Sequence, residues 1–241
     1  MKIVFLTDVH ANRPALAAAL EAIERAGYDL LVHGGDALGI GPDPEACLEM
    51  LLALPRARLL QGNHDAYFAN GLAAPYPDNM SAGEVRHQRW THSQIDPALR
   101  AVVGAWPWEA RLALGAQTIW CGHYARAADG SFGPYLAEPT VTGLDALYAG
   151  VGADLVLYGH DHRPVDQVGR ARYVNPGSLG CSPTAAARYV TVEAGAGPLL
   201  LTHHAVPYDD ASLWEAYVSR AVPERAFIAR AFHGGRCILT D

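Results

Sequence analysis

The chain has no excess of basic side chains. Its 241 residues include 18 Lys and Arg against 25 Asp and Glu, which gives a net charge of −7. A protein that coats nucleic acid or lies on an anionic membrane surface needs a positive footprint, so the composition argues against both classes. A nucleotide substrate stays compatible with this balance, because a local basic patch can still exist. Half of the residues are hydrophobic and only 18% are charged, which excludes a disordered chain.

Cysteine is scarce, and long hydrophobic runs are missing. The four cysteines form neither a C-x-x-C pair nor a closely spaced framework, which indicates reduced thiols, and Cys121 and Cys181 are expected to be buried and inert. The first apolar run, Ile3 to Leu6, is much too short for a signal-peptide core or a membrane span. These absences predict a soluble, cytoplasmic protein without a membrane partner.

Apolar runs alternate with helix signals through the first third of the chain. Strands are expected at Lys2–Asp8, Asp29–His33 and Ala57–Gly62, and helices from the N-cap Asn12 to Ala26 and over Pro44–Leu54. This β-α-β-α-β pattern predicts a parallel sheet with right-handed crossovers.

The remaining two thirds contain shorter elements. A surface loop is expected at Ala66–Pro77, and helices at Ser81–Ser93, Pro97–Gly104 and Thr142–Gly150. Strands are expected at Trp108–Leu114, Gln117–Gly122, Asp154–Tyr158, Val165–Gly169, Ala171–Asn175, Arg188–Glu193 and Leu199–Val206, followed by two helices that flank Pro223. We expect a catalytic domain over residues 1–206, with residues 207–241 as a helical extension packed on it.

Polar residues cluster where five of the predicted strands end. The segments are Asp8-Val9-His10, Gly35-Asp36, Gly62-Asn63-His64-Asp65, Gly122-His123 and Gly159-His160-Asp161-His162. Five of the eleven histidines of the chain fall in them. Because ligands of open α/β sheets bind beyond the carboxyl ends of strands, a shared edge would bring these segments together.

The residue types in these segments suit a metal. In an extended segment residues i and i+2 face the same side, so Asp8 and His10 are expected to bind one ion together, and His160 and His162 repeat the spacing. Imidazole, carboxylate and amide donors suit Mn, Fe, Zn, Ni or Co. They suit neither an all-oxygen Ca or Mg cage nor a thiolate zinc site.

Each segment alone also has a plain structural interpretation. G-N-H-D is a common turn composition, and the carboxylate of Asp36 can simply begin a helix. A lone histidine is more often a hydrogen-bonded structural residue than a ligand. Five such segments in one chain, each after a strand, favour a shared site.

The five segments together resemble the signature of the calcineurin-like metallophosphoesterases. That signature runs D-x-H, G-D, G-N-H-[DE], a histidine block and G-H-x-H, and the resemblance spans Met1 to Val206. G-D-A-L-G-I-G-P-D-P at Gly35–Pro44 and N-P-G-S at Asn175–Ser178 resemble a prokaryotic group of small phosphodiesterase-like members. The resemblance implies an α/β fold, a four-layer αββα sandwich of two mixed β-sheets flanked by helices.

The resemblance also implies a role for each residue of the segments. It implies a binuclear centre of two divalent transition-metal ions, with manganese foremost and iron, zinc, nickel or cobalt as alternatives. The first ion would be held by Asp8, His10 and His162, the second by Asn63, His123 and His160, and both by Asp36. His64 would be the general acid and Asp65 would orient its imidazole, while substrate-binding residues stay unknown.

The sequence departs from the family pattern at three places. Ala11 stands where the first block usually has glycine, and the fourth block reads Gly122-His123-Tyr124 instead of His-Gly, so the shape of the pocket near Tyr124 is open. Gly39 and Ile40 replace the acidic residue and arginine that protein phosphatases and diadenosine-tetraphosphate hydrolases carry.

These features predict a metal-dependent phosphoesterase that hydrolyses small phosphate esters, phosphodiesters or nucleotides. One alternative is a catalytically silent, protein-binding scaffold of the same fold, which the presence of His64 disfavours. A protein phosphatase is a second alternative, disfavoured by the missing Asp-Arg-Gly. The partner is then a small phosphate ester, and a homo-oligomer is compatible with the sequence.

Other histidines and the tryptophans are assigned structural positions. His87 and His92 are expected on the solvent face of a helix, and His203 and His204 in an edge strand. The tryptophans of the middle third, Trp90, Trp106, Trp108 and Trp120, are interpreted mainly as core and cover for the site.

Overall fold

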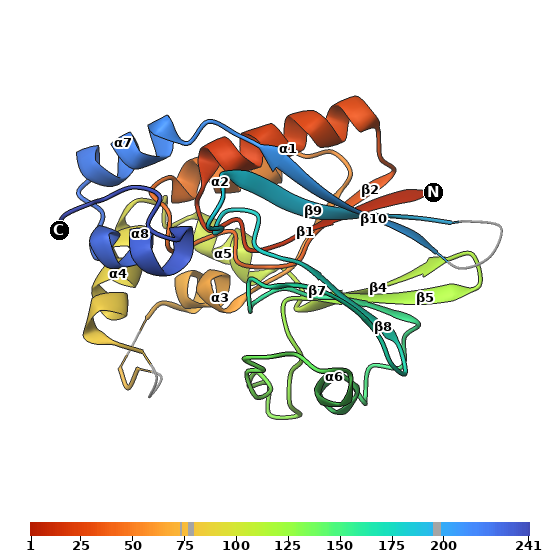
Figure 1. Ribbon diagram of the computed structural model, residues 1–241. Helices are drawn as coiled ribbons and strands as arrows, with labels where there is room; N and C mark the ends of the chain where they lie inside the picture. The colour runs from red at the N-terminus through yellow and green to blue at the C-terminus, as the bar shows by residue number, and fades with distance from the viewer. Residues whose placement is uncertain (73, 77–79, 195–198) are drawn as a thin grey trace.

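Two mixed sheets form the centre of the molecule (Figure 1). The computed structural model describes residues 1–72, 74–76, 80–194 and 199–241. In the first sheet the strand order is β10-β9-β1-β2-β3; β1, β2 and β3 are parallel, and β9 and β10 add antiparallel strands. Its strands are β1 (Lys2–Leu6), β2 (Leu30–His33), β3 (Ala57–Leu59), β9 (Ala186–Glu193) and β10 (Leu200–Pro207).

The second sheet also has five strands, in the order β4-β5-β6-β8-β7. Its three inner strands are parallel, and antiparallel strands β4 and β7 form its edges. The strands are β4 (Glu109–Leu114), β5 (Gln117–Gly122), β6 (Leu155–Leu157), β7 (Pro164–Val168) and β8 (Arg172–Pro176).

Helices cover the outer faces of both sheets (Figure 1). On the first sheet lie α1 (Arg13–Ala26) and α2 (Pro44–Leu52), and α6 (Val141–Leu147) lies on the second. At one end of the sandwich are α3 (Asn63–Asn70), α4 (Ala82–Ser93), α5 (Leu99–Gly104), α7 (Ala211–Ser219) and α8 (Arg225–His233). The predicted αββα sandwich of two mixed sheets is therefore confirmed.

The alternation of side chains along β1 shows how the layers are built. Ile3 and Phe5 are fully buried between the two sheets, whereas Val4 and Leu6 pack on the other side, in the core that α1 and α2 share with the first sheet. A strand buried on both faces has a continuous apolar sequence, as I-V-F-L in β1 does. This burial fixes the end of β1, and with it the start of the segment that carries Asp8.

The first helix begins where the sequence predicts it. The Asn12 side chain accepts a hydrogen bond from the backbone N of Ala15 at 3.1 Å and so caps α1. Gly27 follows the last turn with a φ of 69°, a conformation that favours glycine.

The loop predicted at Ala66–Pro77 is wrong in its first half. Helix α3 occupies Asn63–Asn70, because the Asp65 carboxylate accepts a hydrogen bond from the backbone N of Gly62 at 3.0 Å and caps the helix directly after the turn. Within that predicted loop, residues 73 and 77 lie outside the described part of the chain.

The two helices predicted around Pro223 are present as α7 and α8. Leu213 and Tyr217 of α7, Val222 between the two helices and Ile228 of α8 form a separate core with Ile40 and Cys181. The division of the chain after residue 206 stays a prediction. In the described residues no helix has both the length and the apolar character needed to cross a membrane.

Candidate metal centre

All five predicted segments meet at one edge of the sandwich. They follow the carboxyl ends of β1, β2, β3, β5 and β6, five of the strands with parallel pairing in the two sheets. Segments more than 150 residues apart touch there, since the backbone N of His160 donates to the carboxylate of Asp8 at 3.2 Å. The expectation of a shared edge is therefore confirmed.

The backbone at this edge differs from the extended segments that we expected. Five residues of the segments have left-handed backbone, with φ between 48° and 76°: Asp8, His10, Asp36, His160 and His162. The strands have already ended at Leu6 and Leu157, so tight left-handed turns, and not an i, i+2 strand alternation, aim these side chains inward.

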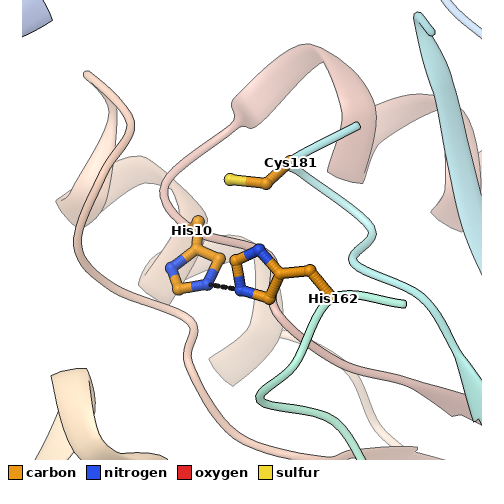
Figure 2. Close-up of side chains that lie close together, drawn as sticks. All are labelled: His10, His162 and Cys181. Atoms are coloured by element: carbon orange, nitrogen blue, oxygen red, sulfur yellow. Dashed lines mark hydrogen bonds between the residues drawn. The ribbon is translucent and has the colours of Figure 1, made fainter. Parts of the chain in front are cut away.

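Asp8, His10 and His162 form one group of donors. The Nε2 atoms of the two imidazoles lie 2.8 Å apart, and Asp8 Oδ1 is 3.8 Å from His10 Nε2 and 3.6 Å from His162 Nε2 (Figure 2 shows the two rings). His10 Nδ1 lies 3.0 Å from the Leu38 carbonyl oxygen. A carbonyl only accepts, so Nδ1 carries the proton and the lone pair of His10 Nε2 points into the group.

Asn63, His123 and His160 form a second group. Asn63 Oδ1 is 3.2 Å from His123 Nε2 and 3.1 Å from His160 Nδ1, and these two nitrogens are 3.2 Å apart. His123 Nδ1 lies 3.2 Å from the Gly34 carbonyl oxygen, which leaves Nε2 as the donor to an ion.

Asp36 lies between the two groups. Its Oδ2 is 3.2 Å from His123 Nε2 and 3.8 Å from His10 Nε2, while its Oδ1 accepts a hydrogen bond from the backbone N of His64 at 2.9 Å. Burial raises the pKa of this carboxyl, but His123, His64 and His10 outweigh burial and hold the pKa well below its usual range.

The donor set fits divalent transition-metal ions. Nitrogen and oxygen donors from seven side chains converge, and the Nε2 atoms of His10 and His162 lie 2.8 Å apart, within hydrogen-bond distance. Burial also raises the pKa of Asp8 to about 7, although His123 opposes it, so a nearby cation would favour the ionised carboxylate that ligation needs.

Cys181 is a buried neighbour of the first group. Its Sγ and one ring nitrogen each of His10 and His162 all lie within 4.8 Å of one another (Figure 2). Burial raises the pKa of this thiol well above its usual value, as it does for Cys121, so both thiols are neutral in the protein without metal. This agrees with the expected reduced and buried thiols.

His64 has a different partner from the one that we expected. Its Nδ1 lies 2.6 Å from Nε2 of Gln88 on α4, and its Nε2 is 4.0 Å from Asp36 Oδ2. Asp65 instead accepts hydrogen bonds from the backbone N atoms of Asp36, Leu38 and Gly62, at 2.8, 3.2 and 3.0 Å. Asp65 therefore holds the loops and Gln88 contacts the imidazole, while the catalytic role expected of Asp65 stays a prediction.

The close approach of Gly39 to His64 accounts for a hydrogen-bond partner of His64 that comes from α4. A Cβ at this position would lie 2.3 Å from His64 Nδ1, and Gly39 has a φ of 79°. The loop that contains Gly39 therefore cannot place a side chain next to Nδ1 of His64. Gln88 approaches from α4 and supplies the contact.

The position predicted for His87 is wrong. The side chain is buried, and its Nδ1 lies 3.2 Å from the Pro223 carbonyl oxygen. Glu84, His87, Gln88 and Thr91 follow the i, i+3, i+4, i+7 spacing of one helix face, a signal in the sequence that could have identified both His87 and Gln88. His203 and His204 are in the edge strand β10, as predicted, where they contact Asp166 and Thr191.

Aromatic side chains pack against the donor groups. Tyr124 is buried with its ring centroid 4.8 Å from that of His160, and its hydroxyl donates to the Pro134 carbonyl at 3.2 Å. Trp106 and Trp120 are buried core residues, in agreement with the interpretation of the tryptophans. Tyr124, where the sequence departs from the family pattern, therefore packs against His160, a donor of the second group.

A cavity of about 500 Å³ opens onto the two donor groups. Asp36, Asn63, His160 and His162 form its floor, next to His64. Residues of α4 and α8 form its walls, with Ile40 and Tyr135. The site can thus admit a small molecule to both donor groups and to His64 at once.

Comparison with known proteins agrees with this geometry. The model of the calcineurin-like phosphoesterase superfamily domain matches residues 1–209. The phosphodiesterase YfcE of Escherichia coli K12 is 30% identical over 181 residues, which cover 74% of this chain and 79% of the relative.

Two solved structures share the fold over nearly the whole chain. The hypothetical protein PH1004 from Pyrococcus horikoshii OT3 has a TM-score of 0.79 at 22% identity and covers 98% of this chain and 99% of its own. A metallophosphoesterase from Sphaerobacter thermophilus has a TM-score of 0.72 at 22% identity, with coverages of 97% and 99%. The chain therefore belongs to the calcineurin-like phosphoesterase superfamily and is a phosphoric ester hydrolase.

Proposed function

We propose that this chain hydrolyses small phosphate esters, phosphodiesters or nucleotides, with two divalent transition-metal ions. The observation that carries the proposal is the position of Asp36 Oδ2, within 3.8 Å of a donor nitrogen of each group. A carboxylate shared in this way is what a two-ion centre requires. The relative YfcE is named a phosphodiesterase, which supports the ester class.

The chain divides its donors between the two ions. Asp8, His10 and His162 would hold the first ion, Asn63, His123 and His160 the second, and Asp36 both. When bound, such a pair polarises a phosphoryl oxygen and makes hydroxide available near neutral pH. Manganese is our first choice, and iron, zinc, nickel and cobalt also suit these donors.

His64 would donate a proton to the leaving alkoxide. The Gln88 amide N–H donates to Nδ1, so a neutral His64 carries its proton on Nε2, the atom that faces Asp36 and the cavity. Gln88 therefore acts as a positioning residue that sets both the ring orientation and the tautomer. This is the orienting role that we expected of Asp65.

The cavity argues against the alternatives. Its volume of about 500 Å³ suits a small ester better than a folded phosphoprotein. A silent scaffold has no need for a buried donor cluster facing a cavity. Turnover of a nitrophenyl phosphodiester should exceed that of a phosphopeptide, and the reverse order would favour a protein phosphatase.

Metal content is the first test of the two-ion centre. Protein reconstituted with manganese should contain close to two ions per chain by elemental analysis, since seven donors with one shared carboxylate suffice for two sites. A value near zero would contradict the proposal.

Substitution of the proposed acid tests the mechanism. His64→Ala should keep both ions and lose ~10²–10⁴-fold activity on alkyl esters, because an alkoxide needs a proton, while nitrophenolate departs without one. Elemental analysis and turnover of both substrate classes measure the two effects. Loss of an ion, or an equal loss on both classes, would show another role for His64.

A further inference from the structure

One wall of the cavity is apolar and comes entirely from α8. Phe227, Ile228 and Phe232, which we call the α8 wall, line the cavity. The Phe232 ring centroid is 5.9 Å from that of His162, and the Phe227 centroid is 6.3 Å from that of Phe232. The apolar surface therefore starts beside a metal-binding side chain and continues outward from it.

Phe227 is the exposed part of this wall. Its side chain is 53% exposed, whereas Ile228 next to it is 3% exposed and belongs to the core between α7 and α8. A large aromatic ring that is half exposed at the edge of a cavity offers contact area to a ligand without further rearrangement.

The wall is held in place before any ligand binds. Ile228 packs with Leu213, Tyr217 and Val222, and buried His233 lies 3.2 Å from the Tyr217 hydroxyl through its Nε2. The Tyr217 hydroxyl also donates to the Ile40 carbonyl at 3.3 Å, which ties these helices to the loop after Asp36. A preorganised wall loses little conformational entropy on binding.

The charges around the cavity are negative. Glu84, Glu224 and Asp161 line it in addition to the metal-binding Asp36, and among the lining residues within the described chain none is Lys or Arg. Arg86 forms an ion pair with Glu224 but does not line the cavity. An ester with a second anionic group would bring that group near carboxylates.

We propose that the α8 wall is a subsite for an uncharged, apolar organic group of the ester, and that the carboxylates exclude esters with a second anionic group. This inference rests on the proposed function, because it needs the phosphate to lie over the metal-binding floor. Helix α8 begins after residue 209, where the family match ends, so the motifs of the family do not assign this subsite.

A series of nitrophenyl phosphodiesters tests the subsite with a constant leaving group. The second ester group is methyl, phenyl or 2-carboxyethyl, and kcat/KM is measured with manganese-loaded protein. We expect the phenyl ester to exceed the methyl ester by roughly 10-fold, the effect of burying one aromatic ring in part. The carboxyethyl ester should fall below the methyl ester by about fivefold, a Coulomb effect of partly screened charges.

Matched variants locate the effect. Phe227→Ala should lower the phenyl-to-methyl ratio of kcat/KM about fivefold, and Phe227→Leu should restore part of it. Val218→Ala is the control, since Val218 on α7 is 57% exposed and does not line the cavity. Glu84→Gln should raise the carboxyethyl-to-methyl ratio, because it removes one facing charge.

The outcomes separate the two proposals. Hydrolysis of none of the three diesters, and of no nitrophenyl phosphate monoester, would overturn the proposed function. Hydrolysis of all three with an equal phenyl-to-methyl ratio in the wild type, Phe227→Ala and Val218→Ala would overturn the α8 subsite and leave the phosphoesterase in place. Preference for the carboxyethyl ester would overturn the exclusion of anionic groups.

Discussion

Replacing Gln88 by methionine should impair protonation of the leaving group and leave the metal centre intact. Gln88 is 1% exposed, and its amide nitrogen is 2.6 Å from His64 Nδ1. Methionine has nearly the same length and is apolar, so it fills the space without a donor. The neutral imidazole can then move its proton to Nδ1, which leaves Nε2 unable to act as an acid.

The size of the effect follows from the hydrogen bond. A neutral hydrogen bond is worth ~1 kcal/mol net, and a buried ring nitrogen left without its partner costs ~1–3 kcal/mol. If the His64 tautomer with its proton on Nε2 is destabilised by about 2 kcal/mol, turnover of an alkyl ester falls roughly 30-fold. Nitrophenyl esters should change less than about threefold, because nitrophenolate leaves without a proton.

The assay compares both ester classes in Gln88→Met and in Thr91→Val, a control at another buried polar residue of α4. Elemental analysis should give equal metal content in both variants. Ring ¹⁵N shifts of His64 in the metal-free protein should place the proton on Nε2 in the wild type and on Nδ1 in part in Gln88→Met. Equal losses on both ester classes, or a loss of metal, would refute the role of Gln88.

Three further predictions follow from single residues. Asp36→Asn should lower the metal content more than Asp8→Asn does, measured by elemental analysis, because Asp36 Oδ2 lies near Nε2 of both His10 and His123, whereas Asp8 Oδ1 lies 3.9 Å from Nδ1 of His123, the nitrogen that faces the Gly34 carbonyl; equal losses would contradict a shared ligand. Gly39→Ala should lower the unfolding free energy, measured in urea, by ~1–2 kcal/mol, because the φ of Gly39 is 79°. It should also lower alkyl-ester turnover, because the new Cβ would meet His64. Unchanged stability and turnover would refute the contact. Burial lowers the pKa of His87 to about 4 from 6.5, so the unfolded chain binds a proton that the folded chain does not, and unfolding free energy should fall by about 1.6 kcal/mol between pH 6.5 and pH 5. In His87→Gln the fall in unfolding free energy between these two pH values should be smaller by about 1.6 kcal/mol, because the unfolded histidine is already half protonated at pH 6.5. An identical fall would show that His87 is not the source.

The donors of the site were predictable because their signals are local. An apolar run followed at once by Asp8, Asp36 or His160 marks a strand end, and strand ends of parallel sheets meet. The cap at Asn12 is equally local, since it concerns atoms only three residues apart. Such features depend on neighbours in the sequence.

The partner of His64 depended on packing between elements. Asp65 is adjacent to His64, but its oxygens face three backbone N atoms, and Gln88 reaches the ring from 24 residues away. That contact exists because α4 packs across the end of α3, which no local pattern encodes. The polar face of α4 marks Gln88 as buried but does not identify what it touches.

The left-handed turns restrict which amino acids these positions can use. Asp and His belong to the few non-glycine residues that adopt positive φ with some frequency, and they are also the donors found at Asp8, His10 and Asp36. A change there to glutamate or cysteine would retain a donor atom yet cost roughly 1–2 kcal/mol in backbone energy. Asn63 and His123 are not among the residues with positive φ. Re-engineering of metal preference is therefore free of this backbone restriction at those two positions.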